Sequence, residues 1–375
     1  MTHIAFLWNN FGPMHADRVE AVASAFPDHT CHGVEVYDQA LSYSWERETR
    51  DNFQKHTLFE KTARPSILTK LKRLLTVRKT IGKADWFLCH YERPEIFLFA
   101  LWLRLTGAKV FTMGCSKFDD FPRTTWREML KSIFFLPYCG AIGSQYRSTE
   151  YFAFHGFRDH SIAHPYNTLS IERMRRQAGV SSLHDLPISF QDRCWIIVAR
   201  LVSKKNLSMA LSAYKIYSQT GGTRRLKILG DGPLEQELKQ KAHNLGIEKL
   251  VKFSGFVQSQ HVSTELAKSV ALILPSKEEQ FGNVVIEAQA LGLPVLLSDV
   301  CGARDMLVRN WKNGFVFEPD NPEGLAGFMT LIDRDEALWR RLSDGAEETA
   351  PTGDVAAFAK ATGTLLGLKS MRGNQ

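Results

Sequence analysis

The stretch Val270-Ala-Leu-Ile-Leu-Pro-Ser-Lys-Glu-Glu-Gln-Phe-Gly-Asn-Val-Val-Ile-Glu287 joins a short apolar strand to a helix through a polar loop. Its first five residues are apolar, a proline ends that run, and helical spacing begins after Asn283. Gly282 permits close backbone approach, and the Asn283 side chain is expected to cap the helix. The free N–H groups of Asn283, Val284 and Val285 would then form an anion site suited to a diphosphate.

Two glutamates flank this junction. Glu287 lies about one turn into the helix, where its side chain leans back towards the N-terminus and could accept two ribose hydroxyls. Glu279 lies in the loop at the strand end and is expected to face a ligand. The alternative makes Glu279 a solvated loop carboxylate and Glu287 a surface helix residue. For Glu287 the small, tightly packed neighbours Ala288 and Ala290 argue against it.

Strands and helices alternate along the rest of the chain, which predicts parallel sheets covered on both faces. The predicted strands are 3–8, 86–90, 109–113, 140–143, 194–198, 225–229, 251–253, 270–274, 294–298 and 314–316. The predicted helices are 16–25, 67–82, 95–105, 126–135, 145–155, 207–218, 234–245, 260–268, 284–291, 322–333 and 336–345. The fold class is therefore α/β, with two Rossmann-like, doubly wound domains. Ligands of such sheets bind beyond the carboxyl ends of the strands, so a central cleft between the two domains is expected.

The pattern Glu279-x7-Glu287, with Phe281-Gly282 inside it and Ala288-x-Ala290-x-Gly292-x-Pro294-Val295 after it, resembles the retaining glycosyltransferases of family 4 (glycosyl transferases group 1). These enzymes have the two-domain GT-B fold. The resemblance implies that Glu279 contacts the donor sugar and that Glu287 contacts the ribose. It also implies that Phe281 and the backbone amides of Gly282, Asn283 and Val284 lie at the donor.

The resemblance continues upstream. The stretch Val198-Ala-Arg-Leu-Val-Ser-Lys-Lys-Asn-Leu207 is similar to the family segment whose Arg and Lys hold the donor diphosphate, here Arg200 and Lys205. Gly230-Asp-Gly-Pro233 and Phe253-Ser-Gly-Phe-Val257 resemble two further loops on the nucleotide side. These imply donor contacts from Gly230 and Asp231, and packing of Val257 near the base. Fixed cations stabilise negative charge on a leaving diphosphate without a metal.

The N-terminal half carries weaker signals. Gly12 fits the glycine loop that the family keeps near the transferred sugar and the acceptor, and His15 either touches a substrate or begins a helix. Many members carry a histidine after the fourth strand, but none follows residues 111–116 here. His90 is the nearest alternative, and Asp120 is a candidate acceptor contact.

The resemblance implies four segments. They are an acceptor-binding domain (1–168), a linker (169–193), a nucleotide-sugar-binding domain (194–350) and a tail (351–375) whose helix returns to the first domain. The activity implied is sugar transfer from a UDP- or GDP-linked donor, used as substrate without a cofactor, to a saccharide or lipid-linked acceptor. Bacterial lipopolysaccharide, exopolysaccharide or glycolipid synthesis is the expected setting. The alternatives are a GT-B epimerase or phosphorylase, and a catalytically silent sugar-nucleotide-binding protein.

The composition of the chain limits the compartment and the classes of binding partner that are expected. Hydrophobic residues make up 44% of the chain and charged residues 23%, the balance of a globular protein with a core. The six cysteines form no C-x-x-C pair, and no signal peptide is recognised, so a cytoplasmic protein with reduced thiols is expected. No nucleic-acid motif accompanies the net charge of +7. No metal site is expected: Asp333-Arg334-Asp335 follows a late helix and is interpreted as surface charge, and no carboxylates complete a site with the histidines near 160.

One segment, 64–83, carries seven basic residues and no acid among apolar residues at helical spacing. Such a helix could lie on the anionic inner face of the plasma membrane. The favoured interpretation is a solvated helix whose apolar stripe packs on the sheet, as every surface helix of this fold requires.

Overall fold

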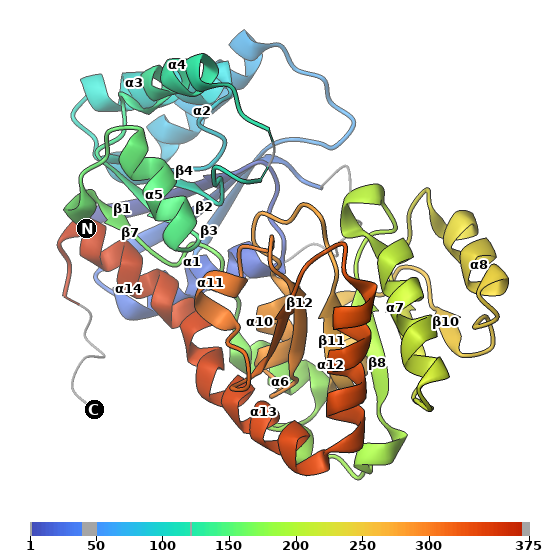
Figure 1. Cartoon of the computed structure of the whole chain (residues 1–375). Coiled ribbons are helices and arrows are strands. Elements are labelled where there is room, and N and C mark those ends of the chain that lie inside the picture. The colour runs from blue at the N-terminus through green and yellow to red at the C-terminus, as the bar shows by residue number, and fades with distance from the viewer. Residues whose placement is uncertain (1, 40–50, 121, 370–375) are drawn as a thin grey trace. The chain divides into compact units, whose positions relative to one another are not determined.

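The computed structural model describes residues 2–39, 51–120 and 122–369. The chain forms two compact units, one made of residues 1–170 and 355–375 and the other of residues 171–354 (Figure 1). Within the described ranges, no helix combines the length and apolar character needed to span a bilayer.

The first unit is built on a seven-stranded parallel sheet in the order β3-β2-β1-β4-β5-β6-β7. Its strands are β1 (Thr2–Trp8), β2 (His29–Tyr37), β3 (Gln54–Phe59), β4 (Ala84–Leu88), β5 (Val110–Gly114), β6 (Gly140–Gly143) and β7 (Ile162–Ala163). Its helices are α1 (Pro13–Ala25), α2 (Ile67–Ile81), α3 (Pro94–Leu105), α4 (Thr125–Phe135), α5 (Tyr146–Phe154) and α14 (Val355–Leu366).

Side chains of successive strand residues enter two separate cores, one on each face of this sheet. The ring of Trp86 meets Phe99 of α3 on one face, with centroids 5.1 Å apart. The ring of Phe87 stacks on Phe6 on the other face, at 5.0 Å, and Phe6 meets Phe358 of α14 there. The sheet is therefore covered on both sides, as the alternation of strands and helices predicts.

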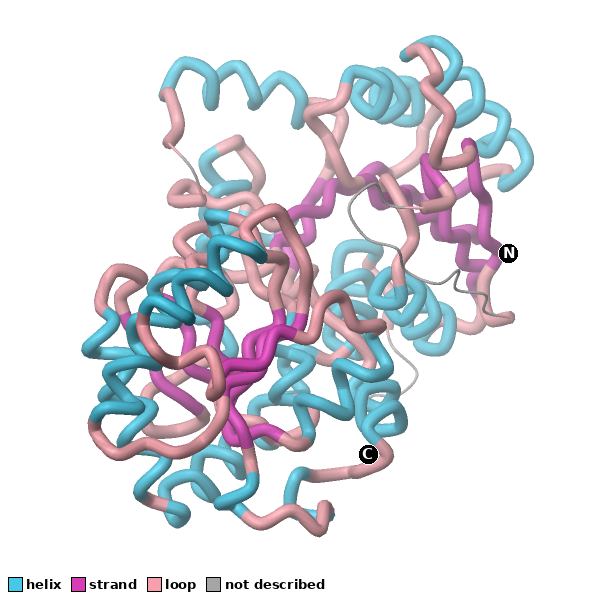
Figure 2. The backbone as a smooth tube through the Cα atoms, turned by 90° about the vertical axis from the view of Figure 1, so that its right-hand side faces the viewer, coloured by secondary structure: helices cyan, strands magenta, loops and turns pink. Residues whose placement is uncertain are grey.

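The second unit has a six-stranded parallel sheet in the order β10-β9-β8-β11-β12-β13. Its strands are β8 (Cys194–Val198), β9 (Leu226–Leu229), β10 (Val251–Phe253), β11 (Ser269–Leu274), β12 (Val295–Ser298) and β13 (Gly314–Phe317). Its helices are α6 (Ile171–Ala178), α7 (Leu207–Gln219), α8 (Glu235–Asn244), α9 (Ser259–Ala267), α10 (Val284–Gln289), α11 (Arg304–Leu307), α12 (Pro322–Arg334) and α13 (Glu336–Thr349). Figure 2 shows the strands and the helices around them.

Strand order reverses between β1 and β4 in one sheet and between β8 and β11 in the other. At such a reversal the loops after two neighbouring strands diverge to opposite faces and leave a crevice for a ligand. In the second unit these are the loops that carry Arg200, Lys205 and Glu279.

The segment 169–193 differs from the expected linker. From residue 171 it belongs to the second unit, and it contains α6, whose Met174 is buried and whose sulfur accepts a hydrogen bond from Ser263 of α9 at 3.6 Å. Met174 is surrounded in the sequence by the charged residues of a strongly basic helix. The sequence pattern therefore did not indicate that one side of α6 packs against the second unit.

Candidate functional site

The loops after β8 and β11 are joined at the carboxyl edge of the second sheet. The backbone N–H of Lys277 donates to the carbonyl of Lys204 at 2.8 Å, which ties the loop after β11 to the short helical turn Ser203–Lys205. The two predicted donor segments, far apart in the sequence, are therefore joined in the structure.

Lys205 and Glu279 meet at this junction. The Lys205 ammonium forms an ion pair with the Glu279 carboxylate, and only 16% and 15% of the two side chains are exposed. The Ser276 hydroxyl donates to the same carboxylate oxygen at 3.3 Å. Arg200 lies in the same loop as Lys205 and is partly buried. The charged groups of Lys205 and Glu279 are thus both partly shielded from solvent, where electrostatic interactions are stronger than in open water.

Two glycines let the loop after β9 press against the loop after β8. Gly230 has φ +135°, and a Cβ there would lie 1.9 Å from the carbonyl oxygen of Ala199. Gly232 has φ +155°, and its Cβ would lie 2.5 Å from the carbonyl oxygen of Leu201. No side chain fits at either position, so the Gly-x-Gly spacing follows from backbone contact.

Hydrogen bonds join the other loops that were predicted to lie on the nucleotide side. Leu201 N–H donates to the Asp231 carbonyl at 2.7 Å, and Gly230 N–H donates to the Gly255 carbonyl at 2.7 Å. The Asp231 side chain is exposed beside these hydrogen bonds. Val257 is partly buried and lies two residues beyond Gly255. The loops after β8, β9 and β10 therefore form one connected edge.

The loop before α10 turns sharply at Gly282, whose φ is +103°. A Cβ at Gly282 would lie 2.9 Å from Cδ2 of Leu274 at the end of β11. Phe281 is 4% exposed, and its carbonyl accepts from Ala303 N–H at 2.9 Å. The glycine allows the close approach that the sequence predicted, and the buried phenylalanine anchors the turn.

The start of α10 corrects two expectations. Asn283 already has right-handed helical geometry, with φ −55° and ψ −29°, and its side chain makes no capping hydrogen bond. Val285 N–H donates to the Gly282 carbonyl at 3.0 Å, so it does not belong to a set of free amides. The physical reason is that the helical turn begins at Gly282, one residue earlier than an extended cap at Asn283 would allow. Asn283 and Val284 remain the predicted amide donors.

Glu287 lies on α10 with its carboxyl group in a protected place. Burial raises the pKa of Glu287 above its usual value, and the nearby charge of Arg173 on α6 opposes this effect. Its neighbours Ala288 and Ala290 are fully buried, as their packing predicted. A partly desolvated carboxyl group of this kind favours a ligand that donates hydrogen bonds.

Gly12 and His15 form the start of α1 in the first unit. Gly12 N–H donates to Nδ1 of His15 at 3.1 Å, and the His15 ring lies 4.8 Å from the Trp8 ring. Burial lowers the pKa of His15 well below 6.5, and the charges of Arg18 and His90 lower it further. His15 is thus a neutral helix-start residue that already holds the Gly12 amide.

His90 directly follows Cys89 at the end of β4, with a positive φ of 62°, and Nδ1 lies 3.6 Å from a carboxylate oxygen of Glu92. A positive φ is uncommon for a residue with a side chain, and such residues cluster at functional sites. His90 lies near enough to His15 for its charge to lower the pKa of His15.

Asp120 is placed differently. It is 5% exposed, and its carboxylate accepts from Arg123 at 2.7 Å and from Lys117 N–H at 3.3 Å. Arg123 also reaches Glu128 of α4 at 3.0 Å. These contacts give Asp120 the structural task of holding the loop after β5.

Glu35 is a residue that positions the predicted glycine loop and that sequence reasoning missed. It is fully buried in β2, and its carboxylate accepts from Phe11 N–H at 2.8 Å, from the Thr57 hydroxyl at 2.7 Å and from Lys55 at 3.0 Å. It fixes the loop that leads into Gly12. A single acidic residue between two valines in an apolar stretch is the signal that could have revealed it.

The Asp333-Arg334-Asp335 motif is surface charge, as expected, at Arg334 and Asp335, which are exposed, whereas Asp333 is partly buried. Two of its side chains also serve the fold. Asp333 pairs with the buried Arg224 and accepts from the Tyr217 hydroxyl at 2.6 Å. Asp335 caps α13 by accepting from Leu338 N–H at 2.9 Å. In the part of the chain that the structure describes, no three His, Cys, Asp or Glu side chains are grouped to hold a metal ion.

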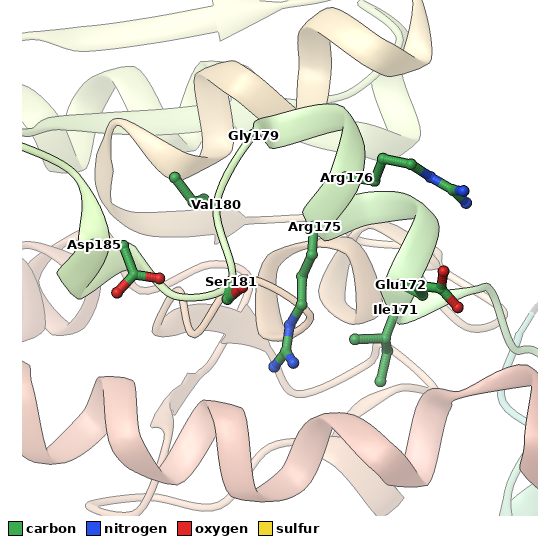
Figure 3. A pocket seen from close by; sticks show the side chains of 8 residues that line it. All are labelled: Ile171, Glu172, Arg175, Arg176, Gly179, Val180, Ser181 and Asp185. Atoms are coloured by element: carbon green, nitrogen blue, oxygen red, sulfur yellow. The ribbon is translucent and has the colours of Figure 1, made fainter.

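A separate surface cavity of about 670 Å³ lies beside α6 and contains none of the predicted site residues (Figure 3). Its lining includes Arg175, Arg176 and Asp185. Arg175 is held by a hydrogen bond from Nε to the Ala290 carbonyl at 2.9 Å, so it connects α6 to the end of α10.

Comparison with known proteins gives a family match over most of the second unit. Residues 185–349 match the family model described as Glycosyl transferases group 1. An exopolysaccharide phosphotransferase of Streptomyces coelicolor is 32% identical over 154 residues, which are 41% of this chain and 16% of that protein. The amylovoran biosynthesis glycosyltransferase AmsK of Erwinia amylovora is 31% identical over 146 residues, 37% of this chain and 36% of that protein. The chain thus spans well under half the length of either curated relative.

Solved structures extend the likeness to nearly the whole chain. The lipopolysaccharide outer core galactosyltransferase WaaB has a TM-score of 0.72 at 18% identity, covering 98% of this chain and 99% of that one. Anabaena HepE in complex with UDP has a TM-score of 0.72 at 17% identity, covering 98% and 100%. At this identity the match establishes the fold, which is GT-B.

Proposed function

We propose that the chain is a retaining glycosyltransferase of family 4, which transfers a sugar from a nucleoside diphosphate to an acceptor hydroxyl. The contact of Lys205 with Glu279 at the strand-order reversal carries the proposal. It brings a cation suited to a diphosphate together with a carboxylate suited to sugar hydroxyls. The group 1 match over residues 185–349 covers both residues and supports the same reading.

The proposed roles follow from charge. Breaking the bond between sugar and diphosphate builds negative charge on the leaving oxygen, which Arg200 and Lys205 stabilise without a metal. Once the diphosphate engages Lys205, the Glu279 carboxylate is available to accept hydrogen bonds from the donor sugar. Glu287 accepts from the ribose hydroxyls, and Val257 packs near the base.

The donor and acceptor are inferred by class. Solved neighbours in complex with UDP and with UDP-glucose support a UDP-linked donor. Relatives named for amylovoran and capsular polysaccharide biosynthesis support an acceptor in an envelope or exported polysaccharide. Gly12, His15 and His90 are the proposed contacts in the first unit.

Nucleotide release from UDP-, GDP- and ADP-sugars tests this function. We expect release from one donor class, faster with acceptor and with the anomeric configuration of the product retained. Lys205→Gln should abolish release, whereas Lys204→Gln, which changes the exposed neighbouring lysine, should not. Epimerised or phosphorolysed donor would show the alternative enzymes, and donor binding without turnover would show a silent binding protein.

A further inference from the structure

Helix α4 presents its apolar side to solvent. Trp126, Met129, Leu130 and Ile133 follow the i, i+3, i+4, i+7 spacing of a single helix face. They are 57%, 65%, 51% and 50% exposed. In a globular protein such an apolar stripe normally faces the core. On α4 it faces the solvent instead.

The opposite side of α4 is held inward by polar contacts. Glu128 is 4% exposed and accepts from the Tyr151 hydroxyl at 2.7 Å, from Lys131 at 2.7 Å and from Arg123 at 3.0 Å. The Ser132 hydroxyl lies 2.9 Å from Nδ1 of His155. This network fixes the rotation of the helix and keeps the apolar stripe outside.

Helix α3 extends the exposed apolar surface. Four of its side chains are exposed: Leu98, Leu101, Trp102 and Leu105. The same helix buries Phe99 and Leu103, so it is apolar on both sides. The rings of Phe97 and Phe134 lie 5.3 Å apart and join α3 to α4, and Figure 1 shows the two helices together. We refer to these exposed side chains of α3 and α4 as the α3–α4 face.

The charge around this face is positive. The exposed basic residues of α2, α3 and α4 are Lys72, Arg73, Lys79, Arg104 and Arg127. The acidic residues of these three helices are Glu95 and Glu128; both are buried, and each is paired with lysine. The α2 stripe packs on the sheet through Leu74 and Ile81, so this helix contributes charge to the surface.

We propose that the α3–α4 face docks on an anionic lipid bilayer, with its apolar side chains among the acyl chains and the α2 cations against the headgroups. Trp102 and Trp126 carry the residue type enriched at the membrane interface. A second copy of this chain is a poorer partner, because it would bring a like-charged surface to the same face. The inference does not depend on which reaction the protein performs.

Co-sedimentation with vesicles tests the proposal. Full-length protein should bind vesicles of phosphatidylcholine with phosphatidylglycerol, bind pure phosphatidylcholine more weakly, and lose much of its binding at high salt. The variant Met129→Gln/Leu130→Gln/Ile133→Gln should lower partitioning about tenfold or more, because three apolar side chains no longer enter the bilayer. Lys72→Gln/Arg73→Gln/Lys79→Gln should remove the preference for anionic lipid, and Lys249→Gln/Lys252→Gln/Arg341→Gln should not.

A matched tryptophan pair provides the control. Trp126 and Trp311 are each 57% exposed, but Trp311 lies in the second unit. Trp126→Gln should weaken vesicle binding, and Trp311→Gln should leave it unchanged. Quenching of tryptophan fluorescence by brominated lipid should fall in the conservative variant Trp126→Phe, which tests insertion even if the polar variants fail to fold.

Two outcomes would overturn the proposal. One is that wild-type protein fails to bind anionic vesicles at low salt. The other is that the protein dimerises in sedimentation velocity, the α4 variant abolishes the dimer, and vesicle binding is the same for both proteins. The face would then be an interface between copies of the chain.

Discussion

The charged ends of Lys205 and Glu279, residues 74 positions apart in the chain, are in direct contact where the loops after β8 and β11 meet. Each partly buried charge neutralises the other, so removing one partner leaves the other uncompensated. Substitutions here therefore need a folding control, which thermal unfolding of each variant provides.

Substitutions of Glu279 and Glu287 should change the steady-state kinetics in different ways. Glu279→Gln should lower kcat about 10²-fold, because it removes a charge whose interaction grows as positive charge develops on the sugar. Glu287→Ala should mainly raise the donor KM, because the ribose does not change during reaction. Steady-state kinetics on the preferred donor measure both, with Glu278→Gln as an exposed neighbour control. Normal kcat in Glu279→Gln together with no turnover in Glu287→Ala would reverse the two roles.

Activity should persist in EDTA, because in the proposed mechanism Arg200 and Lys205 provide the positive charge for the diphosphate. The measurement is nucleotide release after dialysis against the chelator, with and without added magnesium or manganese. Complete loss that either metal restores would refute a mechanism based on side-chain cations.

Gly230→Ala should damage the donor loops more than backbone strain alone explains. Its Cβ would lie 1.9 Å from the Ala199 carbonyl oxygen, whereas Gly221 also has a positive φ but open space around its Cβ. Strain at either position costs about 1–3 kcal/mol, and the collision at Gly230 adds a cost of similar size. Denaturant unfolding of Gly230→Ala and of the control variant Gly221→Ala measures the difference in their free energies of unfolding. Equal losses would show that the Gly230 loop moves aside without cost.

The free energy of unfolding should fall as the pH is lowered from 6.5 towards 4. Burial lowers the pKa of His32 from 6.5 to about 4, and the charges of His56 and His3 add to the effect. Above pH 6.5 the ring is neutral in both folded and unfolded protein. Below it the unfolded chain binds the proton first, which destabilises the fold by up to about 1.4 kcal/mol per pH unit.

The variant His32→Gln should make this pH dependence shallower, measured by denaturant unfolding at several pH values; His15, whose pKa burial also lowers, keeps its own contribution. His160→Gln changes an exposed histidine and should keep the wild-type slope. An unchanged slope in His32→Gln would place the titrating group elsewhere.

The second unit was the more predictable part of the fold. Strands such as β11 are buried along their whole length, and Pro275 and Gly282 mark the loop that follows β11, so an apolar run and turn residues identify this strand clearly. In the first unit β2 and β3 were missed, because β2 mixes His32, Gly33 and Glu35 with apolar residues and β3 is a polar edge strand. Polar residues in a strand resemble those of a loop in the sequence, and only the structure shows the side chains with which they pair.

The candidate site shows the same limit. The positions of Arg200, Lys205, Glu279 and Glu287 follow from strand ends and helix starts. The contact between Lys205 and Glu279 depends on which strands are neighbours, and local spacing does not determine that. The cap at Asn283 was wrong, because a residue's preference for extended backbone was overridden by a turn that begins at Gly282.

Helix α14, at the C-terminal end of the chain, completes the core of the first unit. Its Phe358 is fully buried against Phe6, and a Cβ on Gly363 would lie 2.5 Å from the Phe26 ring. The ribosome makes this helix only after the entire second unit, residues 171–354. The first unit to emerge is thus the last to close its core, and a chain cut short after residue 354 would leave Phe6 and Phe26 uncovered. Loss of the C-terminal helix should therefore destabilise the N-terminal unit.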